Sequence, residues 1–111
     1  MKLTIEIDDE SFIEGYLSFV SLGVLECLKK GFLDFDDAME IIYRPFMIDK
    51  TQELFPDLGN AILAGTQLVD VYNHIPHEFE GVAEEVRESN YKSISKLIRD
   101  NKHHIVYKLD E

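Results

Sequence analysis

GYLSFVSLGVLECL, residues 15–28, is the longest nearly uncharged segment of the 111-residue chain and largely determines its architecture. Only Glu26 places a charge in it, and at helical spacing its large apolar side chains cover much more than one stripe. A helix that is apolar nearly all round is buried on most sides. The segment therefore predicts a helix that is either the central element of the domain or part of a dimer interface. Gly15 and Gly23 would let another helix approach closely.

The same segment is too short to predict a membrane-spanning helix. A span needs about 20 apolar residues, whereas this nearly uncharged window has fourteen residues and is bounded by Glu14 and Lys29. We therefore expect a core helix and no membrane association. The N-terminus, MKLTIEIDDES, lacks the pattern of a signal peptide.

Capping residues and prolines predict where the helices begin and end. Asp8 or Asp9 caps the first helix, which begins near Glu10 and ends at Gly31. Asp34 caps a second helix, which Pro45 terminates. Further helices are predicted at 49–55, from 57 to about 72, and from Pro76 to about residue 99, with a break at 89–90.

Both ends of the chain alternate apolar and polar residues, which is typical of short half-buried strands. The alternating apolar positions are Leu3, Ile5 and Ile7 at one end and Ile105, Tyr107 and Leu109 at the other. The two strands can pair as a small ribbon, with frayed ends as the alternative. The expected fold is mainly α: one compact domain, residues 1–111, with four to six helices around a buried first helix.

Charge and cysteine content limit the classes of function. The chain has 11 basic and 22 acidic residues and a net charge of −11, which repels nucleic acid and anionic lipid and attracts basic partners. Its single cysteine, Cys27, excludes an intramolecular disulfide and a cysteine-rich zinc site. A reducing, cytoplasmic location is therefore expected.

Two groups of residues resemble metal or catalytic sites but fail on spacing. His74 and His77 are three residues apart with Pro76 between them, whereas a helical pair that grips a metal has a spacing of four. In the acidic segment that starts at Asp34, a calcium loop would need glycine at its sixth position and glutamate at its twelfth. Met39 and Pro45 occupy those positions, so helix capping is the simpler explanation.

The remaining nucleophiles and histidines also predict structure rather than chemistry. Cys27, Ser18 and Ser21 lie inside the apolar helix, where burial favours packing and serines can bond to backbone carbonyls. His103 and His104 have no adjacent carboxylate or cysteine, so solvent exposure is expected there. The sequence thus predicts no catalytic, cofactor-binding or metal-binding residue.

Two segments, LSFVSLGVLECLKKGFLDFDDAMEIIYRPFM (17–47) and LGNAILAGTQLVDV (58–71), resemble a small uncharacterised bacterial family, a domain of unknown function. The similarity runs from about Phe12 to Val71 and rests on packing and capping patterns, so it implies no catalytic residues. In size and charge the chain is also similar to immunity proteins that neutralise bacterial toxins.

Together these features predict a non-enzymatic domain whose acidic surface binds a basic protein, with an immunity protein as the most concrete example. The candidate contacts are acidic residues and large amphipathic groups near the second helix, namely Asp34, Asp36, Asp37, Glu40, Tyr43 and Arg44. The alternative is a regulatory or structural homodimer that associates through the apolar first helix. An enzyme that uses Asp34, Asp37 or the histidines ranks third.

Overall fold

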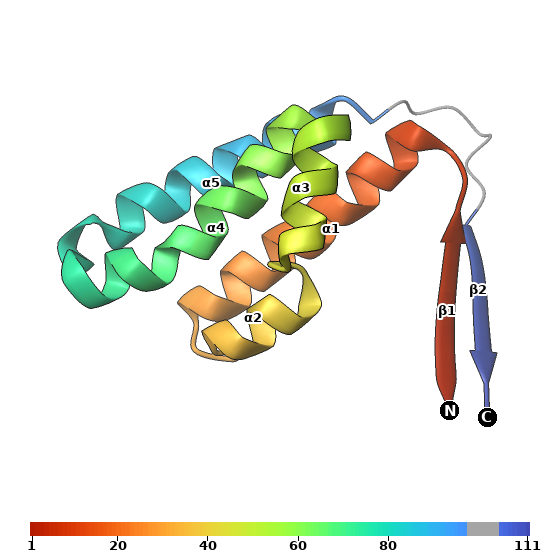
Figure 1. Cartoon of the computed structure of the whole chain (residues 1–111), viewed down its shortest axis with the longest axis horizontal. Coiled ribbons are helices and arrows are strands. Elements are labelled where there is room, and N and C mark those ends of the chain that lie inside the picture. Colours follow the sequence, from red (N-terminus) through yellow and green to blue (C-terminus); the bar gives the residue numbers. More distant parts are fainter. Residues whose placement is uncertain (98–104) are drawn as a thin grey trace.

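The computed structural model describes residues 1–97 and 105–111, and it shows packed helices with a two-stranded ribbon at one end (Figure 1). In chain order the elements are β1 (Lys2–Ile7), α1 (Glu10–Lys29), α2 (Phe35–Ile41), α3 (Pro45–Leu54), α4 (Pro56–His74), the 3-10 helix η1 (Pro76–Glu78), α5 (Phe79–Ser95) and β2 (Ile105–Asp110). The mainly helical fold with paired terminal strands is confirmed.

Local capping chemistry explains the ends of α1 and α2. The Asp9 carboxylate accepts a hydrogen bond from the Phe12 backbone nitrogen at 2.9 Å, and Gly31 follows α1 with a φ of 76°, which favours glycine. At the start of α2, Asp34 and Asp37 form a capping box, in which each carboxylate accepts a hydrogen bond from the other residue's backbone nitrogen. The predicted caps at Asp9 and Asp34 are confirmed.

Several predicted boundaries are wrong. Pro45 is the first residue of α3, where its missing amide proton costs nothing, so this helix begins earlier than predicted. Helix α4 continues to His74, and α5 passes through Ser89 and Asn90 without a break. The side chain of Asn90 is buried, and α5 does not end at this residue. Residues 98 and 99, predicted as helical, lie outside the described residues.

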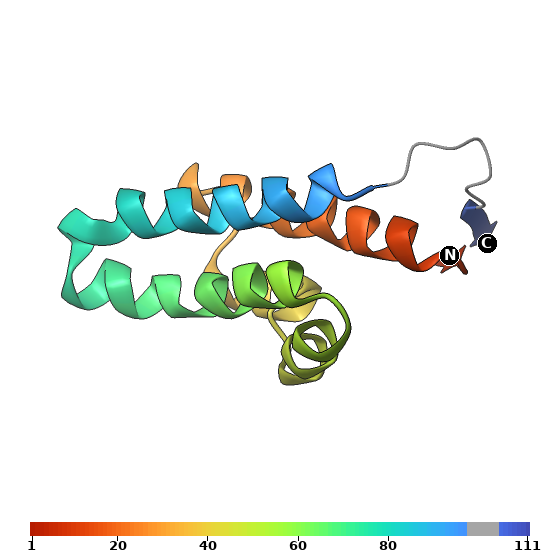
Figure 2. The ribbon, with the colours of Figure 1, turned by 90° about the horizontal axis from the view of Figure 1, so that it is seen from above.

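Helix α1 lies at the centre of the fold, as predicted, and contacts α2, α4, α5 and β1. Figure 2 shows the long helices α1, α4 and α5 running side by side, with α3 against α4. Two clusters of buried apolar residues hold these helices together. One joins α1, α2 and α4 and comprises Val24, Ala38, Ile42, Tyr43, Leu58 and Ile62. The other joins α1, α4 and α5 and comprises Leu25, Ala61, Leu68, Ala83 and Val86.

The face of α1 that packs on α5 includes several small residues beside Leu25. Gly15, Ser18 and Ser21 are buried, whereas Phe19 is 50% exposed. Ser18 Oγ donates to the Glu14 carbonyl at 2.7 Å and lies 2.9 Å from Ser93 Oγ on α5. The expectation that α1 is covered on most sides is confirmed. Small side chains let α5 approach one face, and only Glu10, Phe19 and Gly23 of the helix are exposed.

Length and composition alone do not exclude α1 as a membrane span. The helix has 20 residues and meets both criteria, with 33% of its most apolar 18-residue window buried. The core helix of a soluble protein meets the same criteria. Polar contacts join α1 to α5, including an ion pair between Glu26 and Arg87 at 2.7 Å. The absence of membrane association stays a prediction.

The ribbon joins the two ends of the described chain in an antiparallel register. Leu3 lies opposite Leu109, Ile5 opposite Tyr107, and Ile7 opposite Ile105. Residues directly opposite each other share a face of the sheet, so these six side chains form one apolar face. The other face carries Lys2, Thr4, Glu6, Val106, Lys108 and Asp110.

Candidate functional site

The predicted contact residues around α2 are mostly engaged within the chain. Asp34 and Asp37 are exposed, but their carboxylates cap α2. Glu40 and Arg44 form an exposed ion pair at 2.6 Å, one helical turn apart. Asp36 is exposed and has no ion-pair partner among the described residues. Capping therefore accounts for half of this acidic cluster, and Asp36 is its least engaged carboxylate.

Tyr43 cannot serve as a contact residue, because its side chain is only 1% exposed. Its ring packs beside Gly65 of α4, where a Cβ atom would lie 2.5 Å from the ring carbon Cζ. Its hydroxyl has no hydrogen-bond partner among the described residues. Burial raises the pKa of Tyr43 to about 12. The prediction of Tyr43 as a partner contact is wrong, because an aromatic residue at a helix end is equally suited to the core.

A second acidic region lies on η1 and α5, and more of its carboxylates lack a partner among the described residues than in the cluster around α2. Glu80 pairs with Lys29 at 3.1 Å and Glu84 pairs with Arg87. Glu78, Glu85 and Glu88 are exposed and have no cation partner in the described part of the chain. We call these three residues the acidic ridge. Its carboxylates are available to an external cation, unlike most of those around α2.

The acidic ridge borders a shallow hollow of about 270 Å³, which is lined by His77, Glu78, Gly81, Val82 and Glu85. Gly81 keeps this hollow open, since a Cβ atom built there has no neighbour within 4 Å. Val82 supplies an apolar surface between the two carboxylates. The hollow is thus suited to a lysine or arginine side chain, whose apolar stem packs while its charged head meets Glu78 and Glu85.

These glutamates were not among the predicted contact residues, and the hollow was not predicted. The sequence feature that could have indicated the hollow is the spacing of Glu78, Gly81, Val82 and Glu85. This spacing places all four residues on one face of a helix. The spacing alone does not show that this face is exposed. That information comes from the packing of Ala83 and Val86 on the opposite side of α5.

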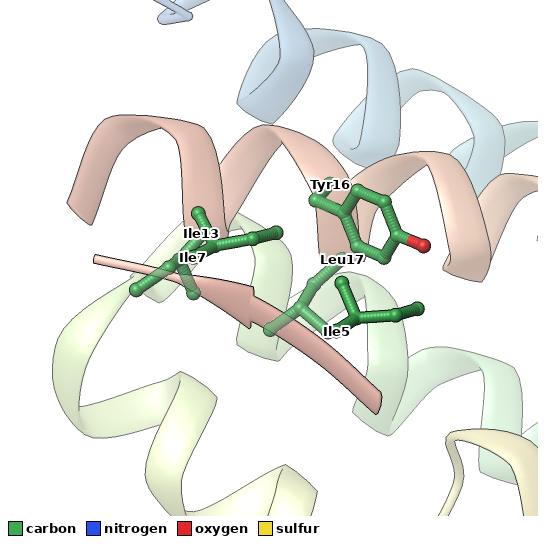
Figure 3. Close-up of a pocket in the computed structure, with 5 residues that line it drawn as sticks. All are labelled: Ile5, Ile7, Ile13, Tyr16 and Leu17. Carbon is green, nitrogen blue, oxygen red and sulfur yellow. The ribbon is translucent and has the colours of Figure 1, made fainter. Parts of the chain in front are cut away.

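The molecule also has an apolar groove of about 290 Å³ between β1 and α1 (Figure 3). Its lining residues are Ile5 and Ile7 from the strand and Ile13, Tyr16 and Leu17 from the helix. Burial and a hydrogen bond with Tyr107 raise the pKa of the Tyr16 hydroxyl. The Tyr16 and Tyr107 side chains thus lie near each other where α1 meets β2, at the edge of the groove.

Beyond the groove, the apolar face of the ribbon is uncovered. Leu3, Tyr107 and Leu109 are 57%, 57% and 62% exposed. The alternation at the chain ends predicted half-buried strands, and only Ile7 and Ile105 of this face are half-buried. The ribbon face and the groove together form an exposed apolar surface, which in a soluble protein is typical of an interaction site.

The other candidate residues lie apart from one another. His74 is the last residue of α4 and His77 lies in η1, on either side of Pro76. No group of three or more metal-ligating side chains occurs among residues 1–97 and 105–111. Ser18 and Ser21 are buried, Ser18 contacts Ser93 of α5, and Cys27 is half-buried in α1. His103 and His104 lie outside the described residues.

The fold and these surfaces define a small helical domain with an accessory strand ribbon. The chain belongs to the DUF3969 family of proteins of unknown function, whose family model matches residues 8–108. The resemblance to a family of unknown function is thereby confirmed, over a longer range than residues 12–71. No curated protein and no solved structure matches the chain significantly.

Proposed function

We propose that this protein is a non-enzymatic binding domain whose acidic ridge engages a basic protein partner. The observation that carries this proposal is the hollow between Glu78 and Glu85, in which two exposed carboxylates without a cation partner in the described residues lie beside the apolar side chain of Val82. A basic toxin would be one partner of this kind.

The overall charge supports the same proposal through the kinetics of encounter. A net charge of −11 attracts a positively charged protein over long distances, and salt screens this attraction. Residues 58–90 contain a single basic residue, Arg87, which is already paired with Glu26 and Glu84. This region therefore presents acidic groups with little internal neutralisation.

The first step of the test is to capture partners from a lysate of the source organism at low and at high salt. We expect a specific basic protein to be recovered at low salt and reduced at high salt. Recovery of no specific protein under either condition would contradict the proposal.

The second step measures binding of the purified partner to two matched double variants. Glu78→Gln with Glu85→Gln removes both carboxylates at the hollow, and we expect at least about tenfold weaker binding. Asp49→Asn with Glu53→Gln removes the same charge from positions on α3 outside the acidic ridge and should leave affinity nearly unchanged. Equal losses in both variants would show that only total charge matters, and the acidic ridge would then not be the binding site.

A third variant separates shape from charge. Gly81→Leu places a side chain in the hollow without changing a charged group, and the open space at Gly81 accommodates it. If a partner side chain enters the hollow, this variant should bind as weakly as the double glutamine variant. Unchanged affinity would mean that the hollow is not occupied in the complex.

A further inference from the structure

Strand β1 has one edge paired with β2, and the other edge has no strand beside it in the described structure. Figures 1 and 2 show the ribbon at one end of the molecule, to the side of the helices. Natural proteins protect such edges with proline, bulges or charges that point inward. The segment KLTIEI has no proline, and its register with β2 is continuous, so it contains no bulge. The outer edge of β1 is therefore able to pair with another strand.

The sequence of β1 is complementary to itself in the antiparallel direction. When two copies are aligned with Thr4 opposite Thr4, Leu3 of each copy faces Ile5 of the other, and Lys2 faces Glu6. Opposite charges and apolar pairs at directly opposed positions both stabilise neighbouring strands. Each favourable pair occurs twice in this arrangement, because a two-fold axis passes through the Thr4 pair.

The distribution of charge favours contact between two copies at the ribbon. Two chains with a net charge of −11 repel each other over most of their surfaces. The twelve residues of β1 and β2, however, contain two lysines, Lys2 and Lys108, and two carboxylates, Glu6 and Asp110. The ribbon is thus locally neutral, and close approach there carries little electrostatic penalty.

Pairing of this kind would also extend the sheet that carries the uncovered apolar face. An isolated two-stranded ribbon is only marginally stable, and additional strands with a shared apolar face stabilise it. The two-fold axis is perpendicular to the sheet, so the apolar faces of both ribbons lie on the same side. Leu3, which is 57% exposed in the single chain, would then lie beside Ile5 of the second copy at the edge of its groove.

We infer that the protein forms a symmetric dimer in which β1 pairs with β1 of a second copy, giving a four-stranded sheet in the order β2–β1–β1–β2. This interface differs from the association through α1 that the sequence predicted. It also uses none of the residues of the acidic ridge, so it does not depend on the proposed basic partner.

The first test is analytical ultracentrifugation of the full chain over a wide range of concentration, comparing the wild type with Thr4→Glu. The introduced carboxylate would lie opposite Lys108 within its own ribbon, which is favourable, and opposite its counterpart in the second copy, which is not. We expect a wild-type dimer and a monomeric variant with unchanged circular dichroism. Thr66→Glu, the same substitution on α4, controls for the added charge and should remain dimeric.

A position-specific cross-link gives an independent readout of the register. In a Cys27→Ser background, Thr4→Cys places two thiols opposite each other at the two-fold axis, within reach of a disulfide. Lys108→Cys places the thiol on β2, away from the axis, as a control. Under oxidising conditions we expect a covalent dimer from the first variant and little from the second.

Three outcomes would overturn the inference. They are a wild type that stays monomeric at all concentrations, a dimer that Thr4→Glu leaves intact, and equal cross-linking of the two cysteine variants. A monomeric wild type whose β1 edge is instead taken up by a different protein would mean that the edge serves a hetero-partner. The acidic-ridge proposal would be unaffected by any of these results.

Discussion

The helical body and the terminal ribbon use the same apolar residue types with opposite results. Leu25 of α1 is completely buried between α4 and α5, whereas Leu3 and Leu109 of the ribbon remain mostly in solvent. In the body, each apolar cluster joins several elements of the same chain. In the ribbon, only the end next to α1 is covered. An apolar pattern therefore identifies a surface that requires a partner, but it does not say whether that partner belongs to the same chain.

The largest expected effect comes from removing equivalent side chains in the two regions. Leu25→Ala should lower the free energy of unfolding by about 2–5 kcal/mol, because it leaves a cavity in a fully packed core. Leu3→Ala should change it by less than about 0.5 kcal/mol, because that side chain is mostly hydrated in the single chain. Urea unfolding, followed by circular dichroism at concentrations where the chain is monomeric, measures both values. Similar losses of unfolding free energy in the two variants would show that Leu3 is packed as firmly as Leu25.

A titration in alkaline solution examines the body at Tyr43. Burial raises the pKa of its hydroxyl to about 12, compared with roughly 10 in an unfolded chain. Between these values the unfolded state has lost a proton that the folded state keeps, so stability falls as pH rises, by about 1.4 kcal/mol per unit. Below about pH 10 both states are protonated and the contribution of Tyr43 is constant.

The variant Tyr43→Phe should lose less stability than the wild type over this alkaline range, when both are unfolded with urea at a series of pH values. Tyr91→Phe, at an exposed position on α5, controls for the removal of a hydroxyl group. Parallel pH profiles for wild type and Tyr43→Phe would contradict the burial of this residue in a rigid core.

A smaller effect is expected from two glycines that differ in their surroundings. A Cβ atom at Gly59 would lie 2.5 Å from the Gln52 Cα atom, and backbone cannot move aside cheaply. Gly59→Ala should therefore lower the free energy of unfolding by roughly 1–3 kcal/mol. At Gly23 of α1 an added Cβ atom has no neighbour within 4 Å, so Gly23→Ala should raise the free energy of unfolding by about 0.5–1 kcal/mol. Thermal unfolding separates the two, and stabilisation by both would show that α3 and α4 pack less closely than described.

The features that the sequence predicted well are local. Asp9 and Asp34 cap their helices through bonds to residues three positions later, so the information lies within one helical turn. The strand alternation was equally local, and pairing of the two strands was correctly predicted from it. Gly15 was expected to permit close approach, and the Leu97 side chain does pack against it. Gly23 was expected to do the same but has no near neighbour.

The orientation of α1 could not be predicted, because a helix that is apolar nearly all round has no unique inward face. The bulky residues were the expected core, but Ser18 and Ser21 are also fully buried and Phe19 is 50% exposed. Small side chains allowed α5 to come close, and a buried contact between Ser18 and Ser93 joins the two helices. Such pairings depend on residues about 75 positions apart, which no helical periodicity reports.

The candidate sites could not be predicted for the same reason, because they depend on contacts and exposure that arise only from packing. The acidic cluster at 34–40 was prominent in the sequence, but two of its carboxylates cap α2 and a third pairs with Arg44. Glu78 and Glu85 were not among the predicted contact residues. Their exposure around an open glycine became evident from the packing of α5.

The pairing of β1 with β2 sets an order on folding during synthesis. Ile7 can pair with Ile105 only after residue 105 has been made and has left the ribosome, whereas the residues of α1 to α5 are all made before those of β2. Until then, both edges of β1 are open on the nascent chain. A chain truncated after residue 97 should therefore contain assembled helices and an unpaired N-terminal strand.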